Sequence, residues 1–168
     1  ARGRGNPKHS EPITADLLEL LVAVCEEEAA AATSDEDREA ALNRADAWVF
    51  SWTFGLRCDE IVSFVAEPDR VRVEPDGRGA SLNISLSKTN LEQKDTWRTA
   101  GCSCDAAVVG PEAAERRRPT CAVHRLKARL RRRKGKEFPL IYWFEERCAD
   151  PGVPVRRVPR RWTKAALL

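Results

Sequence analysis

Four residues that are able to bind a metal ion stand in two close pairs in the second half of the chain. Cys102 and Cys104 form one pair, and Cys121 and His124 form the other. Three thiols and one imidazole are a common ligand set for tetrahedral zinc, and the spacing of the second pair suits a helix start. The first pair is tighter than the usual zinc spacing. The sequence therefore predicts a structural zinc, the alternative being four reduced side chains that pack without metal.

A second candidate site lies in the string from Thr53 to Phe64. Gly55 is suited to end a helix, because glycine accepts the left-handed conformation found there. Arg57 then falls at the start of the next helix, where its guanidinium can clamp a phosphate with two hydrogen bonds. Glu60 follows on the same helical face and could hold the arginine in place. The alternative is an ordinary Arg–Glu surface pair.

Two lysines stand in the segment that follows an alternating apolar run. They are Lys88, in Leu86-Ser87-Lys88-Thr89-Asn90, and Lys94. An ammonium group beside a phosphate neutralises developing charge and can protonate an alkoxide leaving group. The alternative is a lysine that protects an exposed strand edge.

Positive charge is concentrated downstream. Residues 1–60 have 6 Lys and Arg against 13 Asp and Glu, whereas residues 61–168 have 23 against 13. Such a distribution favours a polyanion partner through counterion release, and a solvated helix face is an equal alternative. The candidate DNA contacts lie between residues 116 and 136 and are Arg116, Arg117, Arg118, Arg125, Arg129, Arg132 and Lys134.

The elements that position these groups form an α+β domain that is mostly helical. Apolar residues at helical spacing predict three helices, with Thr14 and Ser34 as N-caps and with Trp48 and Trp52 on a buried face. Period-two alternation around Pro75-Asp76-Gly77 predicts a small antiparallel β-meander of three strands. Two further segments follow the meander, a Cys-rich connection and a basic helix. The predicted bounds are 1–11 for a flexible basic arm, 12–145 for the domain and 146–168 for an uncertain tail. Within the domain they are 14–31, 35–54 and 57–65 for the helices, 70–99 for the meander, 101–120 for the connection and 121–134 for the basic helix.

This order of elements resembles the catalytic domain of tyrosine recombinases, the phage-integrase family. The resemblance rests on two helices, the Gly55-Leu56-Arg57-x-x-Glu60 junction and a meander that carries Lys88, and it runs from about Pro12 to about Leu140. It implies the N-terminal half of that fold, with Arg57 gripping the scissile phosphate, Glu60 supporting the site and Lys88 acting as general acid for the 5′ hydroxyl. The complete enzyme would break and rejoin DNA through a 3′-phosphotyrosyl intermediate and would need no cofactor for catalysis.

The chain departs from the family pattern after the meander. His124-Arg125-Leu126-Lys127 has lysine where the family's His-x-x-Arg box needs arginine. The one tyrosine, Tyr142, stands in a hydrophobic string typical of a core segment. We therefore expect the chain to be inactive as an enzyme on its own, and to be a fragment or a decayed copy of a mobile element.

Length and composition restrict the remaining classes. A chain of 168 residues and 18.8 kDa is enough for about one domain. Its longest apolar run, Leu17 to Cys25, is far shorter than the roughly 20 residues of a membrane span, and no secretory signal is visible. The six cysteines favour a reducing compartment. We expect DNA as the partner, self-association on DNA in the complete protein, and a nuclear location in a eukaryote or a cytoplasmic one otherwise. The alternative function is a non-catalytic zinc-stabilised nucleic-acid-binding module.

Overall fold

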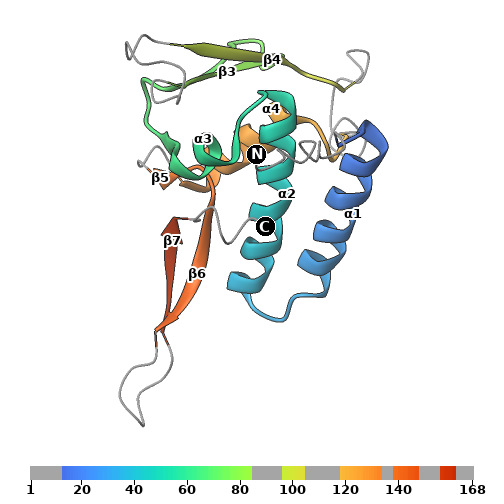
Figure 1. Ribbon diagram of the computed structural model, residues 1–168, viewed down its shortest axis with the longest axis vertical. Helices are drawn as coiled ribbons and strands as arrows, with labels where there is room; N and C mark the ends of the chain where they lie inside the picture. Colours follow the sequence, from blue (N-terminus) through green and yellow to red (C-terminus); the bar gives the residue numbers. More distant parts are fainter. Residues whose placement is uncertain (1–12, 85–95, 105–117, 134–137, 148–155, 162–168) are drawn as a thin grey trace, which may run out of the picture.

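The computed structural model describes residues 13–84, 96–104, 118–133, 138–147 and 156–161. These residues form an α+β fold, as predicted, in which a three-stranded sheet lies across one end of a group of helices (Figure 1). The helices are α1 (Ala15–Ala31), α2 (Asp35–Thr53), α3 (Cys58–Ser63) and α4 (Ala122–Arg133). The strands are β1 (Val65–Ala66), β2 (Val71–Val73), β3 (Gly79–Asn83), β4 (Trp97–Gly101), β5 (Phe138–Pro139), β6 (Tyr142–Arg147) and β7 (Arg156–Arg161).

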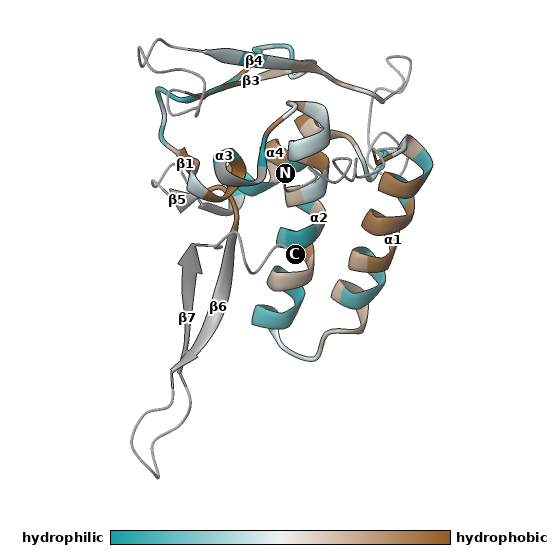
Figure 2. Cartoon of the chain, in the orientation of Figure 1, coloured by the Kyte–Doolittle hydropathy of each residue, from teal (hydrophilic) through white to brown (hydrophobic). Residues whose placement is uncertain are grey.

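Helices α1 and α2 form an antiparallel pair, and both begin at the predicted caps. The Thr14 hydroxyl accepts a hydrogen bond from the Leu17 N–H at 3.2 Å, and the Ser34 hydroxyl accepts one from the Asp37 N–H at 3.1 Å. The buried face of α1 carries Leu18, Val22, Cys25 and Ala29. In Figure 2 the hydrophilic turns gather where α1 ends and α2 begins, away from the sheet.

The end of α2 is also as predicted, except for one tryptophan. Gly55 follows the helix with a φ of 59°, the left-handed conformation that glycine accepts at low cost. Trp52, predicted to be buried, is 46% exposed. It lines an open cavity of about 380 Å³, whose described walls also include Ala15 and Leu18 of α1 and Ala122 of α4.

The predicted meander is present as the antiparallel sheet β2-β3-β4. Leu82 pairs with Val71 on one side and with Arg98 on the other, and its side chain is fully buried. The turn between β2 and β3 contains Gly77 with a φ of 70°. Strand β3 begins at Gly79, earlier than the apolar alternation indicated, because the residues before Leu82 are small and pair well with β4.

Two strand pairs were not predicted. Strand β1 pairs with β5, which brings Leu140 and Ile141 into the core beside Phe64. Strand β6 pairs with β7 along six residues each, so part of the predicted uncertain tail is a strand. The arginine-rich sequence of β7 has no apolar alternation, and it therefore gave no strand signal.

One hydrophobic core joins the helices to the sheet. Val123 and Leu126 of α4 are fully buried against residues of α2 and β3, and Leu130 packs at the edge of the core. Among the described helices, none combines the length and the apolar composition needed to cross a membrane. The predicted arm at residues 1–11 lies outside the described residues.

Candidate functional site

The four predicted metal ligands come together where the sheet meets α4. Cys102 and Cys104 follow directly after β4, Cys121 precedes α4, and His124 lies in its first turn. Their ligand atoms all lie within 4.8 Å of one another, so the cluster can hold a metal ion. The prediction that these residues form one site is confirmed.

The distances within the cluster suit a tetrahedral ion. The Sγ atoms of Cys102 and Cys121 are 3.6 Å apart, and Nδ1 of His124 lies 3.8 Å from Sγ of Cys102 and 3.3 Å from Sγ of Cys104. Two sulfur ligands of tetrahedral zinc, each about 2.3 Å from the metal, lie roughly 3.7–3.8 Å apart. The three cysteines are not joined by disulfides. A small rearrangement would therefore place all four ligands around one ion.

The electrostatic environment differs between the thiols. For Cys121, burial acts to raise the pKa, but hydrogen bonds from the backbone of His124 and Ser103 outweigh it and lower the pKa to about 7. Burial raises the pKa of Cys104 to about 11, although the Arg118 N–H donates a hydrogen bond to its sulfur at 3.3 Å. Of these two thiols, Cys121 is thus the one that more readily becomes a thiolate near neutral pH.

The second candidate site is the junction between α2 and α3. Arg57 is the N-cap residue of α3, and its side chain is exposed. Its backbone N–H donates to Oε2 of Glu60 at 2.8 Å. Glu60 is 4% exposed, so its carboxylate points inward. The predicted contact between the two residues therefore runs through the Arg57 backbone, and no described carboxylate pairs with the Arg57 guanidinium.

Arg98 of β4 is a residue at this junction that the sequence analysis missed. Its Nη1 donates to the carbonyl oxygens of Phe54, at 3.2 Å, and of Gly55. Its Nη2 lies 3.4 Å from each carboxylate oxygen of Glu60. No local pattern indicates this role, because the contacts join residues about 40 positions apart in the chain. Arg98 thereby joins the sheet to both helices at the junction.

Both candidate lysines, Lys88 and Lys94, lie outside the described residues. The connection that contains them leaves β3 at Ile84 and returns at Thr96, and these two residues are hydrogen-bonded at 2.8 Å from N to O. Thr96 is two residues from Arg98. The connection therefore begins and ends at the same end of the sheet as the junction contact.

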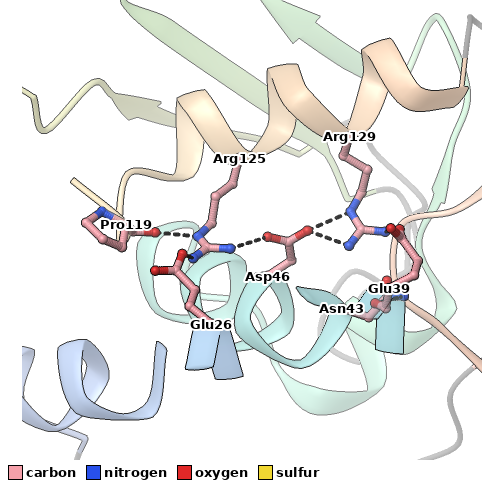
Figure 3. A network of polar contacts seen from close by, with 7 residues as sticks. All are labelled: Glu26, Glu39, Asn43, Asp46, Pro119, Arg125 and Arg129. Carbon is pink, nitrogen blue, oxygen red and sulfur yellow. Dashed lines mark hydrogen bonds and ion pairs between the residues drawn. The ribbon is translucent and has the colours of Figure 1, made fainter. Parts of the chain in front are cut away.

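Two of the seven predicted DNA contacts, the buried Arg129 and the partly buried Arg125, instead belong to a polar network between α4, α2 and α1 (Figure 3). Arg129 is fully buried, and its Nε and Nη2 both donate to Oδ2 of Asp46, the Nε at 2.8 Å. Arg125 donates to Oδ1 of Asp46 at 2.9 Å, to Oε1 of Glu26 at 2.5 Å and to the carbonyl of Pro119. The DNA contact predicted for Arg129 is therefore wrong, and Arg125 has its donors directed at protein acceptors.

Of the other five predicted DNA contacts, only Arg118 has a described side chain. Arg118 is exposed beside the metal cluster. Arg116, Arg117 and Lys134 lie outside the described residues, and the side chain of Arg132 does as well. For these five residues DNA binding stays a prediction.

Comparison with protein-family models, curated proteins and solved structures finds no match to this chain. The fold and the two candidate sites are thus the basis for any assignment of function.

Proposed function

We propose that this chain binds DNA as part of a tyrosine-recombinase-like protein, with Arg57 as a ligand of a backbone phosphate. The observation that carries the proposal is the arrangement at the α2–α3 junction. The side chain of Arg57 is exposed, and its backbone N–H donates a hydrogen bond to Oε2 of Glu60 at 2.8 Å. Arg98 of β4 links the neighbouring sheet to the same junction. A guanidinium on a fixed backbone is well suited to a phosphate, because it matches two phosphate oxygens at once.

The position of the β3–β4 connection supports a role for Lys88. Its two ends, Ile84 and Thr96, lie beside Arg98, which in turn contacts Gly55, two residues before Arg57. In the complete enzyme Arg57 would stabilise charge on the phosphate while a tyrosine attacks it. Lys88 would protonate the departing 5′ hydroxyl, and Lys94 is the reserve for this step.

We infer that the metal at Cys102, Cys104, Cys121 and His124 is zinc, and that its role is structural. Three thiolates and one imidazole select zinc over the harder cations that prefer oxygen ligands. Four protein ligands leave no open coordination position for a substrate. The ion would fasten the end of β4, and so the sheet, to the start of α4.

The DNA proposal predicts that Arg57→Ala weakens binding to duplex DNA at least about 10-fold at moderate salt, since one charge-assisted phosphate contact is worth about 1.5–3 kcal/mol. The variant should also lower the slope of log affinity against log salt by about one unit. Fluorescence anisotropy with a labelled duplex at several KCl concentrations measures both. Arg38→Ala is the matched control, because Arg38 is an exposed arginine at the opposite end of α2.

If Arg57→Ala loses no more affinity than Arg38→Ala, the phosphate role of Arg57 is refuted. The second candidate function, a non-catalytic zinc-stabilised nucleic-acid-binding module, would then be favoured. Its supporting observation is the exposed Arg118, whose N–H contacts a metal-site sulfur. In that case the triple variant R116A/R117A/R118A should lose most of the binding, while Arg57→Ala has little effect.

A further inference from the structure

We propose that Arg98 is a positioning residue, which neutralises the buried carboxylate of Glu60 and so leaves the Arg57 guanidinium available to bind an anion. This inference rests on the proposed function in one respect, that the anion is a DNA phosphate. The charge arrangement that it describes concerns only Arg57, Glu60 and Arg98.

The first step is the need of Glu60 for a positive partner. Its side chain is 3% exposed, and a buried carboxylate is costly unless it is paired and hydrogen-bonded. Among the described side chains, Arg98 is the one cation in contact with it, with Nη2 at 3.4 Å from both oxygens. Arg57 contributes a neutral backbone N–H instead of its charge.

The second step is that Arg98 is held in place by more than Glu60. Its Nη1 donates to the carbonyl oxygens of Phe54 and Gly55, at the C-terminal end of α2. Such carbonyls lack partners within the helix, and the helix dipole favours a cation there. The side chain is only 27% exposed, so the guanidinium is fixed against Glu60 before any ligand arrives.

The third step is competition between the two arginines. The Arg57 backbone N is 2.8 Å from Oε2 of Glu60, and residues three apart on a helix are close enough for their side chains to pair. Without Arg98, the Arg57 guanidinium is a positive group that can turn back to the carboxylate. Its charge would then be neutralised inside the protein, and its phosphate affinity would fall.

The inference predicts a loss and a recovery of DNA affinity. Arg98→Gln should weaken binding about 10-fold, like Arg57→Ala. The double variant E60Q/R98Q should bind within about threefold of the wild type, because no carboxylate remains to capture Arg57. The matched controls are R38Q and D35N/R38Q, which remove the same charges from the exposed Arg38–Asp35 pair and should each change affinity less than about twofold. Anisotropy with the same labelled duplex measures all five variants, and thermal melting shows that each is folded.

A purely structural role for Arg98 gives a different result, since E60Q/R98Q would then bind as weakly as R98Q. That outcome would overturn the inference. Arg98→Lys provides a second test if R98Q does not fold: a lysine retains the charge beside Glu60, so affinity should stay within about threefold, and a fall to the level of Arg57→Ala would also contradict the inference.

NMR separates failure of the inference from failure of the proposed function. In R98Q the Nε–Hε signal of Arg57 should shift and exchange more slowly as the ion pair with Glu60 forms, and in E60Q/R98Q it should return to the wild-type position. This readout needs no DNA. If the Arg57 signal behaves as expected but Arg57→Ala binds DNA normally, the charge arrangement is supported and the phosphate role of Arg57 is refuted. If the Arg57 signal is unchanged in R98Q, the inference itself is overturned.

Discussion

Removal of the proposed zinc from the Cys102, Cys104, Cys121 and His124 cluster is expected to lower the free energy of unfolding by about 4 kcal/mol or more, because loss of a structural metal is among the most destabilising single changes. In a chain of this length that loss corresponds to a fall in Tm of roughly 10 °C. The physical reason is that the four ligands come from two segments, the end of β4 and the start of α4, which the metal would hold together. Calorimetry before and after treatment with a chelator measures the change, and readdition of zinc should reverse it.

A cysteine substitution provides the same test without a chelator. Cys121→Ser should abolish stoichiometric zinc binding and lower Tm as much as chelation does, with elemental analysis measuring one zinc per chain in the wild type and none in the variant. Cys25→Ser is the matched control, because Cys25 is also a buried free thiol but lies on α1 outside the cluster. A chelated protein that melts within about 2 °C of the untreated one, or a Cys121→Ser variant no less stable than Cys25→Ser, would contradict the structural zinc.

The sequence was sufficient to predict the metal cluster because its chemistry is local. Each pair of ligands is close in the chain, and thiols and imidazoles in such pairs have few other uses. The same is true of the helices, whose caps Thr14 and Ser34 lie within three residues of the groups they bind. Gly55 was predicted correctly for a similar reason, since left-handed backbone at a helix end favours glycine over every other residue.

The charged contacts were not predictable in the same way, because they join residues far apart in the chain. Arg98 reaches Glu60 across 38 residues, and Arg129 reaches Asp46 across 83. The position of Arg129 in the helix does, however, indicate that its side chain is buried. Arg129 lies three residues after Leu126 and therefore on the buried face of α4, where an arginine needs a carboxylate partner. The density of positive charge along the sequence does not distinguish a buried arginine from an exposed one, and the DNA contact predicted for Arg129 was based on that density.

Asp46→Asn is expected to destabilise the protein by about 3–5 kcal/mol, because it removes the negative charge that Arg125 and Arg129 share in a buried network, and Glu26 and Glu39 then balance the two guanidinium groups less fully. Asp46 is 2% exposed and accepts hydrogen bonds from both Arg125 and Arg129. The amide has nearly the same shape, so the change tests charge and not packing. Urea unfolding followed by circular dichroism measures the loss.

Two further variants decide whether uncompensated charge is the cause. Asp35→Asn breaks the exposed ion pair with Arg38 and should cost less than about 1 kcal/mol, since the partners are 94% and 52% exposed. Adding Arg129→Met to Asp46→Asn removes the buried guanidinium and should restore part of the stability, because an apolar chain of similar length needs no partner in the core. If the double variant is less stable than Asp46→Asn alone, the cost arises from lost packing or hydrogen bonds at α4 and not from a stranded charge.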